Sequence, residues 1–131
     1  MSNRSIGVFI AIFGASGVSL GAFGAHALKA QLTATGQLEN WRTAVSYQMI
    51  HVLAALALWT LLHAAERAPR PNLLRAAIAC WLAGLVLFSG SIYGLCLGGP
   101  HWLGPVTPLG GLALIAGWLC VLAASLSEKN A

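Results

Sequence analysis

Charged side chains are scarce in this sequence. Its 131 residues include seven Lys and Arg and three Asp and Glu, so that 8% are charged, whereas soluble domains average about 25%. Three long stretches contain none of these residue types, at residues 5–28, 43–65 and 76–127. A helix needs about 20 mostly apolar residues to cross a bilayer core. The sequence therefore indicates a membrane protein and leaves no segment for a separate soluble domain.

The third charge-free stretch is too long for one span, and a glycine- and proline-rich segment at residues 98–105 interrupts it. We predict an all-α fold, a four-helix transmembrane bundle that forms one integral membrane domain over residues 1–131. The predicted helices cover residues 6–25, 43–63, 76–98 and 106–126. Because the inner connection and the last outer one are short, we expect up-down-up-down order.

Lys and Arg divide unequally between the two sides of these spans. Only Lys29 and Arg42 fall on one side. The other side carries Arg4, Arg67, Arg70, Arg75 and Lys129. Cytoplasmic segments carry an excess of Lys and Arg, so we predict that both termini are cytoplasmic in a bacterial inner (plasma) membrane. The positive net charge then reflects topology and does not indicate a nucleic-acid partner.

The five tryptophans fit two aromatic belts at the membrane boundaries. Trp41 and Trp102 are expected at the outer boundary, and Trp59, Trp81 and Trp118 towards the inner one. An alternative makes the first span a cleaved signal peptide that ends in an A-x-A pattern at residues 25–27. Signal-peptide apolar regions have about 7–15 residues, and the longer run here favours a retained helix.

Glycines recur along the predicted helices with spacings that place them on single faces. In lipid, small residues let helix backbones approach closely. We therefore predict helix packing at Gly14, Gly17, Gly21, Gly24, Gly90, Gly94 and Gly110. A seam between molecules is the alternative use of one such face. Between the first two spans, Leu28, Leu32, Leu38 and Trp41 predict a short amphipathic segment in the interface, interrupted at Gly36.

Polar side chains inside the spans gather in their outer halves. Intramembrane polar residues are functional suspects by default. At similar depth on several helices, these groups can converge on one small pocket that opens outward, or they can bond one another and fix the helix register. The candidate pocket residues are His26, Tyr47, Gln48, His51, Ser89, Tyr93 and Thr107.

A metal or cofactor site is not expected. A stable zinc site needs about four ligands, and no Cys, Asp or Glu lies at the depth of the best imidazole pair, His26 and His51. His51 also lies about two turns deeper than the end of the first helix, which disfavours haem ligation by this pair. Cys80, Cys96 and Cys120 lack C-x-x-C spacing and are interpreted as small packing residues.

Catalytic motifs are also lacking. The sequence contains no G-x-S-x-G, no H-E-x-x-H and no glycine loop followed by Lys. No carboxylate lies in any predicted span to complete a catalytic triad. Ion-coupled transporters usually place a charged side chain near the midplane. We therefore predict no enzymatic activity, and the missing charge weakens the hypothesis of a minimal transporter.

Four ordered strings carry a family resemblance: GAFGAHAL at 21–28, WRTAVSYQMIH at 41–51, FSGSIY at 88–93 and GPVTPLGG at 104–111. In this order and spacing the chain resembles the family called domain of unknown function 423, now grouped with transmembrane protein 256. The resemblance implies a small four-helix integral membrane protein, found in the bacterial inner membrane and in eukaryotes, and implies no particular activity, substrate or cofactor.

The family motif positions overlap the polar and glycine sets chosen above. They are Gly21, Gly24, His26, Tyr47, Gln48, His51, Ser89, Gly90, Tyr93, Thr107, Pro108 and Gly110. Ala27 departs from the pattern, because a glycine is common there. A glycine would leave the end of the first helix more flexible.

The favoured hypothesis is a non-enzymatic packing or accessory component of membrane assemblies. Its expected partners are membrane lipids, further copies of itself or a larger membrane complex. One alternative is a small-ligand or metal-binding membrane protein that uses the outer pocket around His26, Gln48 and His51. The other alternative is the minimal transporter.

Overall fold

The computed structural model describes residues 2–64 and 70–126 and has only helices and turns over those ranges. Its helices are α1 (Asn3–Ala25), α2 (Lys29–Ala34), α3 (Leu38–Ala64), α4 (Pro71–Cys96) and α5 (Leu103–Leu126). The four longer ones are long and apolar enough to cross a membrane. This confirms the predicted all-α class and the number of spans. Arg67 and Lys129, used for the predicted orientation, lie outside the described ranges.

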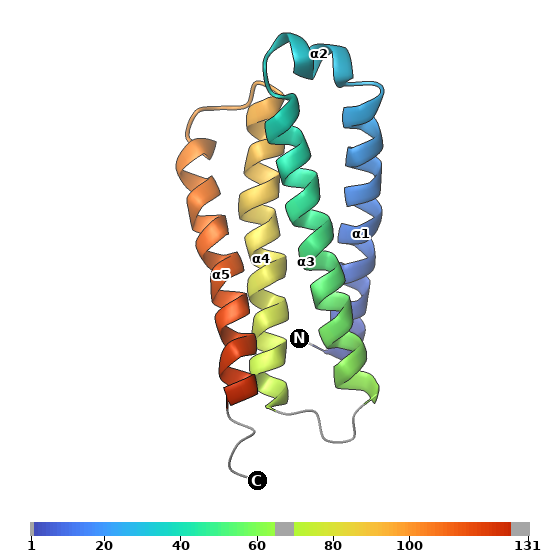
Figure 1. Ribbon diagram of the computed structural model, residues 1–131, viewed down its shortest axis with the longest axis vertical. Coiled ribbons are helices and arrows are strands. Elements are labelled where there is room, and N and C mark those ends of the chain that lie inside the picture. The colour runs from blue at the N-terminus through green and yellow to red at the C-terminus, as the bar shows by residue number, and fades with distance from the viewer. Residues whose placement is uncertain (1, 65–69, 127–131) are drawn as a thin grey trace.

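The four long helices lie side by side in the order α1, α3, α4, α5, and α2 lies across one end (Figure 1). α3 and α4 pack on each other in the middle, α1 packs mainly on α3, and α5 packs on α4. The outer helices therefore keep broad apolar faces exposed, which in α5 include Leu112, Ile115, Leu119 and Leu122. Lipid tails are as apolar as Leu, so such faces suit a bilayer.

The main core lies between the two middle helices and takes side chains from both outer helices, α1 and α5. Its buried side chains are Ile6, Ile10, Val52, Ala55, Ile78, Trp81, Leu82, Leu85 and Leu114. A second, smaller cluster at the α2 end joins Leu32, Trp41 and Cys96. Leu32 is fully buried, so this one side chain anchors the short helix α2 on the ends of the long helices.

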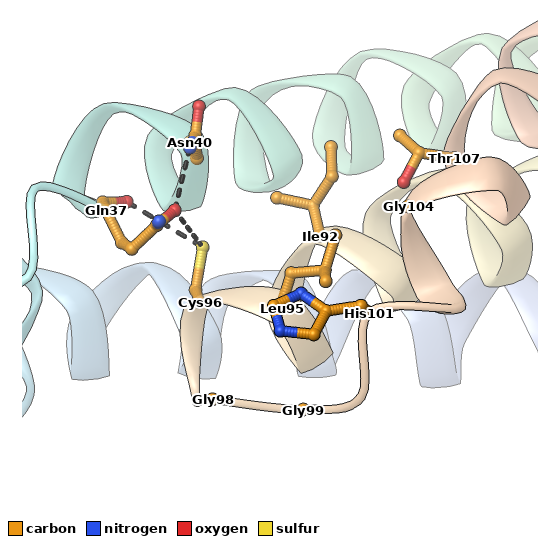
Figure 2. A pocket seen from close by; sticks show the side chains of 10 residues that line it. All are labelled: Gln37, Asn40, Ile92, Leu95, Cys96, Gly98, Gly99, His101, Gly104 and Thr107. Carbon is orange, nitrogen blue, oxygen red and sulfur yellow. Dashed lines mark hydrogen bonds between the residues drawn. The ribbon is translucent and has the colours of Figure 1, made fainter.

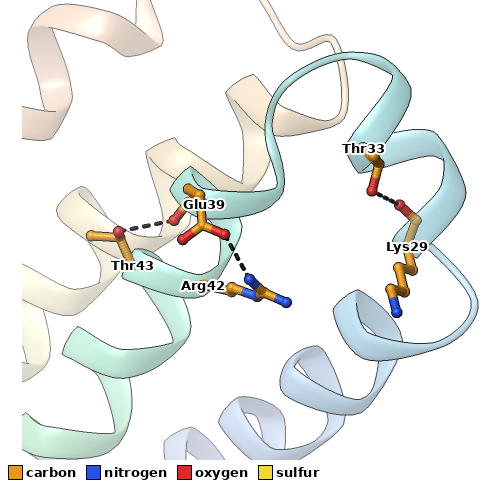
Figure 3. Close-up of polar contacts among 5 residues, drawn as sticks. All are labelled: Lys29, Thr33, Glu39, Arg42 and Thr43. Carbon is orange, nitrogen blue, oxygen red and sulfur yellow. Dashed lines mark hydrogen bonds and ion pairs between the residues drawn. The ribbon is translucent and has the colours of Figure 1, made fainter.

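The predicted interfacial segment divides at Gly36, whose φ of +69° suits glycine. α2 precedes this residue, and α3 begins soon after it at Leu38, earlier than the predicted start at residue 43. Glu39 in the first turn of α3 forms a 2.6 Å ion pair with Arg42 (Figure 3). A carboxylate near a helix N-terminus is favourable. The absence of charge therefore marks the apolar part of α3, and the helix itself extends beyond it.

The bounds of the last two helices also differ from the predicted ones. α4 begins at Pro71, where the fixed φ of proline suits the first helical position, and it ends at Cys96 before Gly98 reaches a φ of +82°. α5 begins at Leu103 rather than at residue 106. Pro105 lies in its first turn, where a missing N–H costs no intrahelical bond.

The glycines of α1 face α3 within the same chain. A Cβ added at Gly17 would stand 2.7 Å from the sulfur of Met49, and one at Gly24 would overlap the ring of Trp41. Real Cβ atoms essentially never approach other atoms closer than 3.0 Å. Gly7, Gly14 and Gly21 also stand next to α3 side chains. This surface is therefore occupied inside the molecule.

Two tryptophans of α3 lie against this glycine surface. The indole of Trp41 donates to the carbonyl of Leu20 at 2.9 Å, and that of Trp59 donates to the carbonyl of Asn3 at 2.8 Å. Trp41 is 2% exposed and Trp81 is 1% exposed. The rings of Trp41 and Trp81 therefore pack inside the molecule, where glycines on the facing helices leave room for them.

The other predicted packing glycines divide into two kinds. A Cβ at Gly110 would overlap backbone atoms of Leu87 and Phe88, and one at Gly94 would stand 2.7 Å from Leu103. These glycines allow close contact of α4 with α5. Gly90 instead lies on the exposed side of α4, where only the Leu85 carbonyl of its own helix stands as close as 4.0 Å.

A substitution at the α1–α3 contact tests this account. Gly24→Ala should lower the free energy of unfolding by about 1–3 kcal/mol, because the new methyl group overpacks against Trp41. Gly14→Ala is the matched control, since its Cβ would stand 3.6 Å from Val52 at ordinary contact distance. Unfolding in mixed detergent micelles measures both. Equal stability of the two variants would contradict close packing at Gly24.

Candidate functional site

The structure distributes the predicted pocket residues over several contacts instead of one pocket. Gln48 and Tyr93 meet between α3 and α4. His51 bonds with α5, and Ser89 with the backbone of α3. His26 is exposed at the end of α1.

Gln48 joins three helices through its amide. Its Nε2 donates to the carbonyl of Phe13 at 2.7 Å and to the hydroxyl of Ser16 at 2.9 Å, both on α1. Its Oε1 accepts from the hydroxyl of Tyr93 on α4 at 2.9 Å. The side chain is 3% exposed. Both amide N–H groups are therefore in use, and the buried amide has no free donor for a ligand.

Both ring nitrogens of His51 have partners. The indole Nε1 of Trp118 on α5 donates to Nε2 at 3.1 Å, and Nδ1 lies 2.8 Å from the carbonyl of Tyr47. An indole N–H can only donate. Nε2 must therefore be the acceptor, and Nδ1 carries the proton and donates to Tyr47. This buried imidazole has no lone pair left for a metal ion.

Ser89 and Ser91 connect α4 to the helices on either side of it. The Ser89 hydroxyl donates to the carbonyl of Ala44 on α3 at 2.9 Å. The Ser91 hydroxyl lies 2.7 Å from that of Thr107 on α5. Both serines are buried, because α4 lies between α3 and α5. Of the two, Ser91 was not among the candidate residues chosen from the sequence. Polar bonds therefore link all four long helices.

Metal-binding side chains are not brought together in the described ranges. Among these residues no three His, Cys, Asp or Glu could hold one metal ion. His51 bonds with α5, which lies across the molecule from α1 and its terminal His26 (Figure 1). The His51 imidazole is thus bonded to α5, whereas His26 lies exposed at the end of α1.

A cavity of about 710 Å³ lies between the start of α3, the end of α4 and the start of α5 (Figure 2). Its lining residues are Gln37, Asn40, Ile92, Leu95, Cys96, Gly98, Gly99, His101, Gly104 and Thr107. Of the predicted pocket residues, Thr107 alone lines it. We call it the outer cavity, because its end of the molecule was predicted to face outward. Gln37 and Asn40 were not predicted from the sequence, since they precede the charge-free stretch at 43–65.

The polar bonds of Gln48 generate a stability prediction. Gln48→Leu should destabilise the protein by about 1–3 kcal/mol, because the half-buried Tyr93 hydroxyl loses its acceptor. Adding Tyr93→Phe should recover part of that loss, since the unpaired hydroxyl is then removed. Ser125→Ala is the control, because the exposed Ser125 bonds only within its own helix. Additive losses in the double variant, measured by chemical unfolding, would contradict direct coupling.

Comparison with known proteins supplies the family. The family described as "Protein of unknown function (DUF423)" matches residues 20–111, a range that includes all four strings singled out above. No solved structure matches the chain.

Several relatives are similar over most of their length. A UPF0382 membrane protein of Schizosaccharomyces pombe is 38% identical over 117 residues, covering 86% of this chain and 93% of the relative. The UPF0382 membrane protein YwdK of Bacillus subtilis is 38% identical over 109 residues, with coverages of 83% and 85%. The UPF0382 inner membrane protein YgdD of Escherichia coli K12 is 37% identical over 132 residues, with coverages of 99% and 95%.

These matches confirm the resemblance first seen in the sequence strings. The relatives are named as membrane proteins, in agreement with four helices that can each cross a membrane. The chain belongs to the DUF423 family of membrane proteins.

Proposed function

We propose that this protein is a non-enzymatic packing or accessory component of membrane assemblies. The observation that carries the proposal is that polar side chains at the centre of the molecule already have hydrogen-bond partners within the protein. The amide N–H groups of Gln48 and both nitrogens of His51 are bonded to neighbouring helices. These contacts fix the helix register and leave the exposed apolar faces as the surfaces for lipid or for other membrane proteins.

We further propose that the chain lies in a bacterial inner membrane as an up-down-up-down bundle with both ends in the cytoplasm. Trp59 near the end of α3 bonds to Asn3 at the start of α1, which supports antiparallel packing of these helices. Arg75 near the start of α4 also donates to the Asn3 side chain, at 3.3 Å. Arg-bearing ends therefore gather together, as the positive-inside rule requires of a cytoplasmic face.

Orientation can be tested with single cysteines. Cys80, Cys96 and Cys120 are replaced by Ala, and Thr35→Cys or Asn72→Cys is added, since both positions are exposed at opposite ends. A maleimide that cannot cross membranes should label Thr35→Cys in intact cells. It should label Asn72→Cys only after permeabilisation. The reverse pattern would overturn the proposed orientation and leave the packing proposal untouched.

A ligand or metal site around His26, Gln48 and His51 is the alternative function. A ligand there would have to break existing bonds of Gln48 and His51, which makes the packing function the better supported one. The transporter alternative lacks a charged side chain in the apolar stretches 5–28, 43–64 and 76–126. Ion-coupled transporters usually need such a charge near the midplane.

Substitution of His51 separates packing from ligand binding. His51→Leu should lower the unfolding temperature in detergent, because the indole of Trp118 loses its acceptor. Native mass spectrometry of protein taken gently from its own membrane should show protomers with lipid or with other proteins. A non-lipid adduct that disappears in the His26→Ala, His51→Ala double variant would instead establish the ligand site and overturn the proposal.

A further inference from the structure

The outer cavity has the size of a small-molecule site. Its volume of about 710 Å³ lies within the range of about 300–1,000 Å³ that is usual for ligand pockets. It lies at the end of the molecule where α2 lies, and its walls come from three different long helices (Figures 1 and 2). The polar network of Gln48 and His51 takes no part in it.

Charge is absent from the lining of this cavity. None of its lining residues is Asp, Glu, Lys or Arg. Glu39 and Arg42 in the first turn of α3 bond to each other at 2.6 Å and do not line it. A desolvated ion of either sign would have no counter-charge. The Cys and His of the lining provide fewer than the about four ligands of a stable zinc site. An uncharged ligand therefore fits this lining best.

The lining nevertheless has hydrogen-bonding capacity to spare. Gln37 Oε1 accepts from Asn40 Nδ2 at 2.7 Å and from the thiol of Cys96 at 3.7 Å (Figure 2). This arrangement orients the Gln37 amide and leaves its Nε2 without a partner among the described residues. Asn40 Oδ1 and the ring nitrogens of the exposed His101 also have no partner among the described residues. Amide and imidazole groups both donate and accept, as hydroxyl groups do.

Two further features of the lining suit a sugar. Ile92 and Leu95 provide an apolar side for the C–H groups of a sugar ring. A Cβ added at Gly98 or Gly104 would meet no atom within 4 Å. The positive φ of Gly98 explains its glycine. Neither backbone conformation nor packing explains Gly104, whose missing side chain simply leaves the cavity open.

From these contacts we infer that the outer cavity binds an uncharged, hydroxyl-rich molecule, either a free sugar or the sugar headgroup of a lipid. Gln37, Asn40 and His101 form its hydrogen bonds, and the amide pair of Gln37 and Asn40 is oriented before the ligand arrives. Such preorganisation lowers the entropy cost of binding.

The test uses the full-length protein in nanodiscs of phosphatidylethanolamine and phosphatidylglycerol, which contain no sugar. Radiolabelled glucose, N-acetylglucosamine and maltose are the free probes, and dodecyl maltoside is the lipid-like probe. We expect saturable binding of at least one probe, with about one molecule per protomer. Asn40→Ala should weaken it about two- to tenfold, as loss of one neutral hydrogen bond does.

Gly104→Leu is the decisive variant, because Gly104 lines the cavity and a Cβ added there would meet no atom within 4 Å. The leucine side chain would then occupy space that the ligand needs. It should abolish binding while the unfolding temperature stays unchanged. Gly90→Leu is the matched control, since a Cβ at Gly90 would meet no atom closer than 4.0 Å and Gly90 lies outside the cavity. This variant should bind as the original protein does. Binding of dodecyl maltoside alone would identify a lipid headgroup as the ligand. Absence of binding by every probe, or undiminished binding by folded Gly104→Leu, would overturn the inference.

Discussion

Close contact between helix backbones is the constraint on which the rest of this structure depends. Helices inside lipid gain little by burying apolar surface, because lipid tails are equally apolar. They associate through close packing and polar bonds. Here glycines of α1 let the rings of Trp41 and Trp59 lie against that helix, and Gly110 brings the backbone of α5 onto α4. Once the backbones are this close, the short side chains of Ser89 and Ser91 reach neighbouring helices.

The polar bonds then give the packed helices a single register. Gln48 reaches two helices from the middle of α3, and His51 reaches a third one turn away. Bonds of this kind contribute about 0.6 kcal/mol each on average in a measured bundle, so their chief effect is orientation. A centre organised in this way is well suited to a scaffold. The unused polar groups lie instead at one end, around Gln37 and Asn40.

The sequence predicted the fold further than it predicted the contacts. The long stretches without charged residues identified four spans, because a charged side chain in lipid is costly and membrane spans therefore contain few of them. These stretches misplaced the start of α3, since Glu39 and Arg42 continue the helix outside the apolar stretch. Depth estimates grouped polar side chains of several helices into one candidate pocket, but depth does not specify helix rotation or neighbour order. The burial of Trp41 and Trp81 was not predicted either, because a sequence does not reveal the glycine opposite each ring.

The order of the helices in space bears on how the chain enters the membrane. α1 lies beside α3, α3 beside α4, and α4 beside α5, so the large helix contacts join spans that follow one another in synthesis. The bonds of Trp41 and Trp59 to α1 require nothing beyond residue 64. The first hairpin can therefore close while the second is still being made. Local pairing of this kind gives low contact order and rapid folding, and the bonds of Tyr93 and Ser89 to α3 then join the second hairpin to the first.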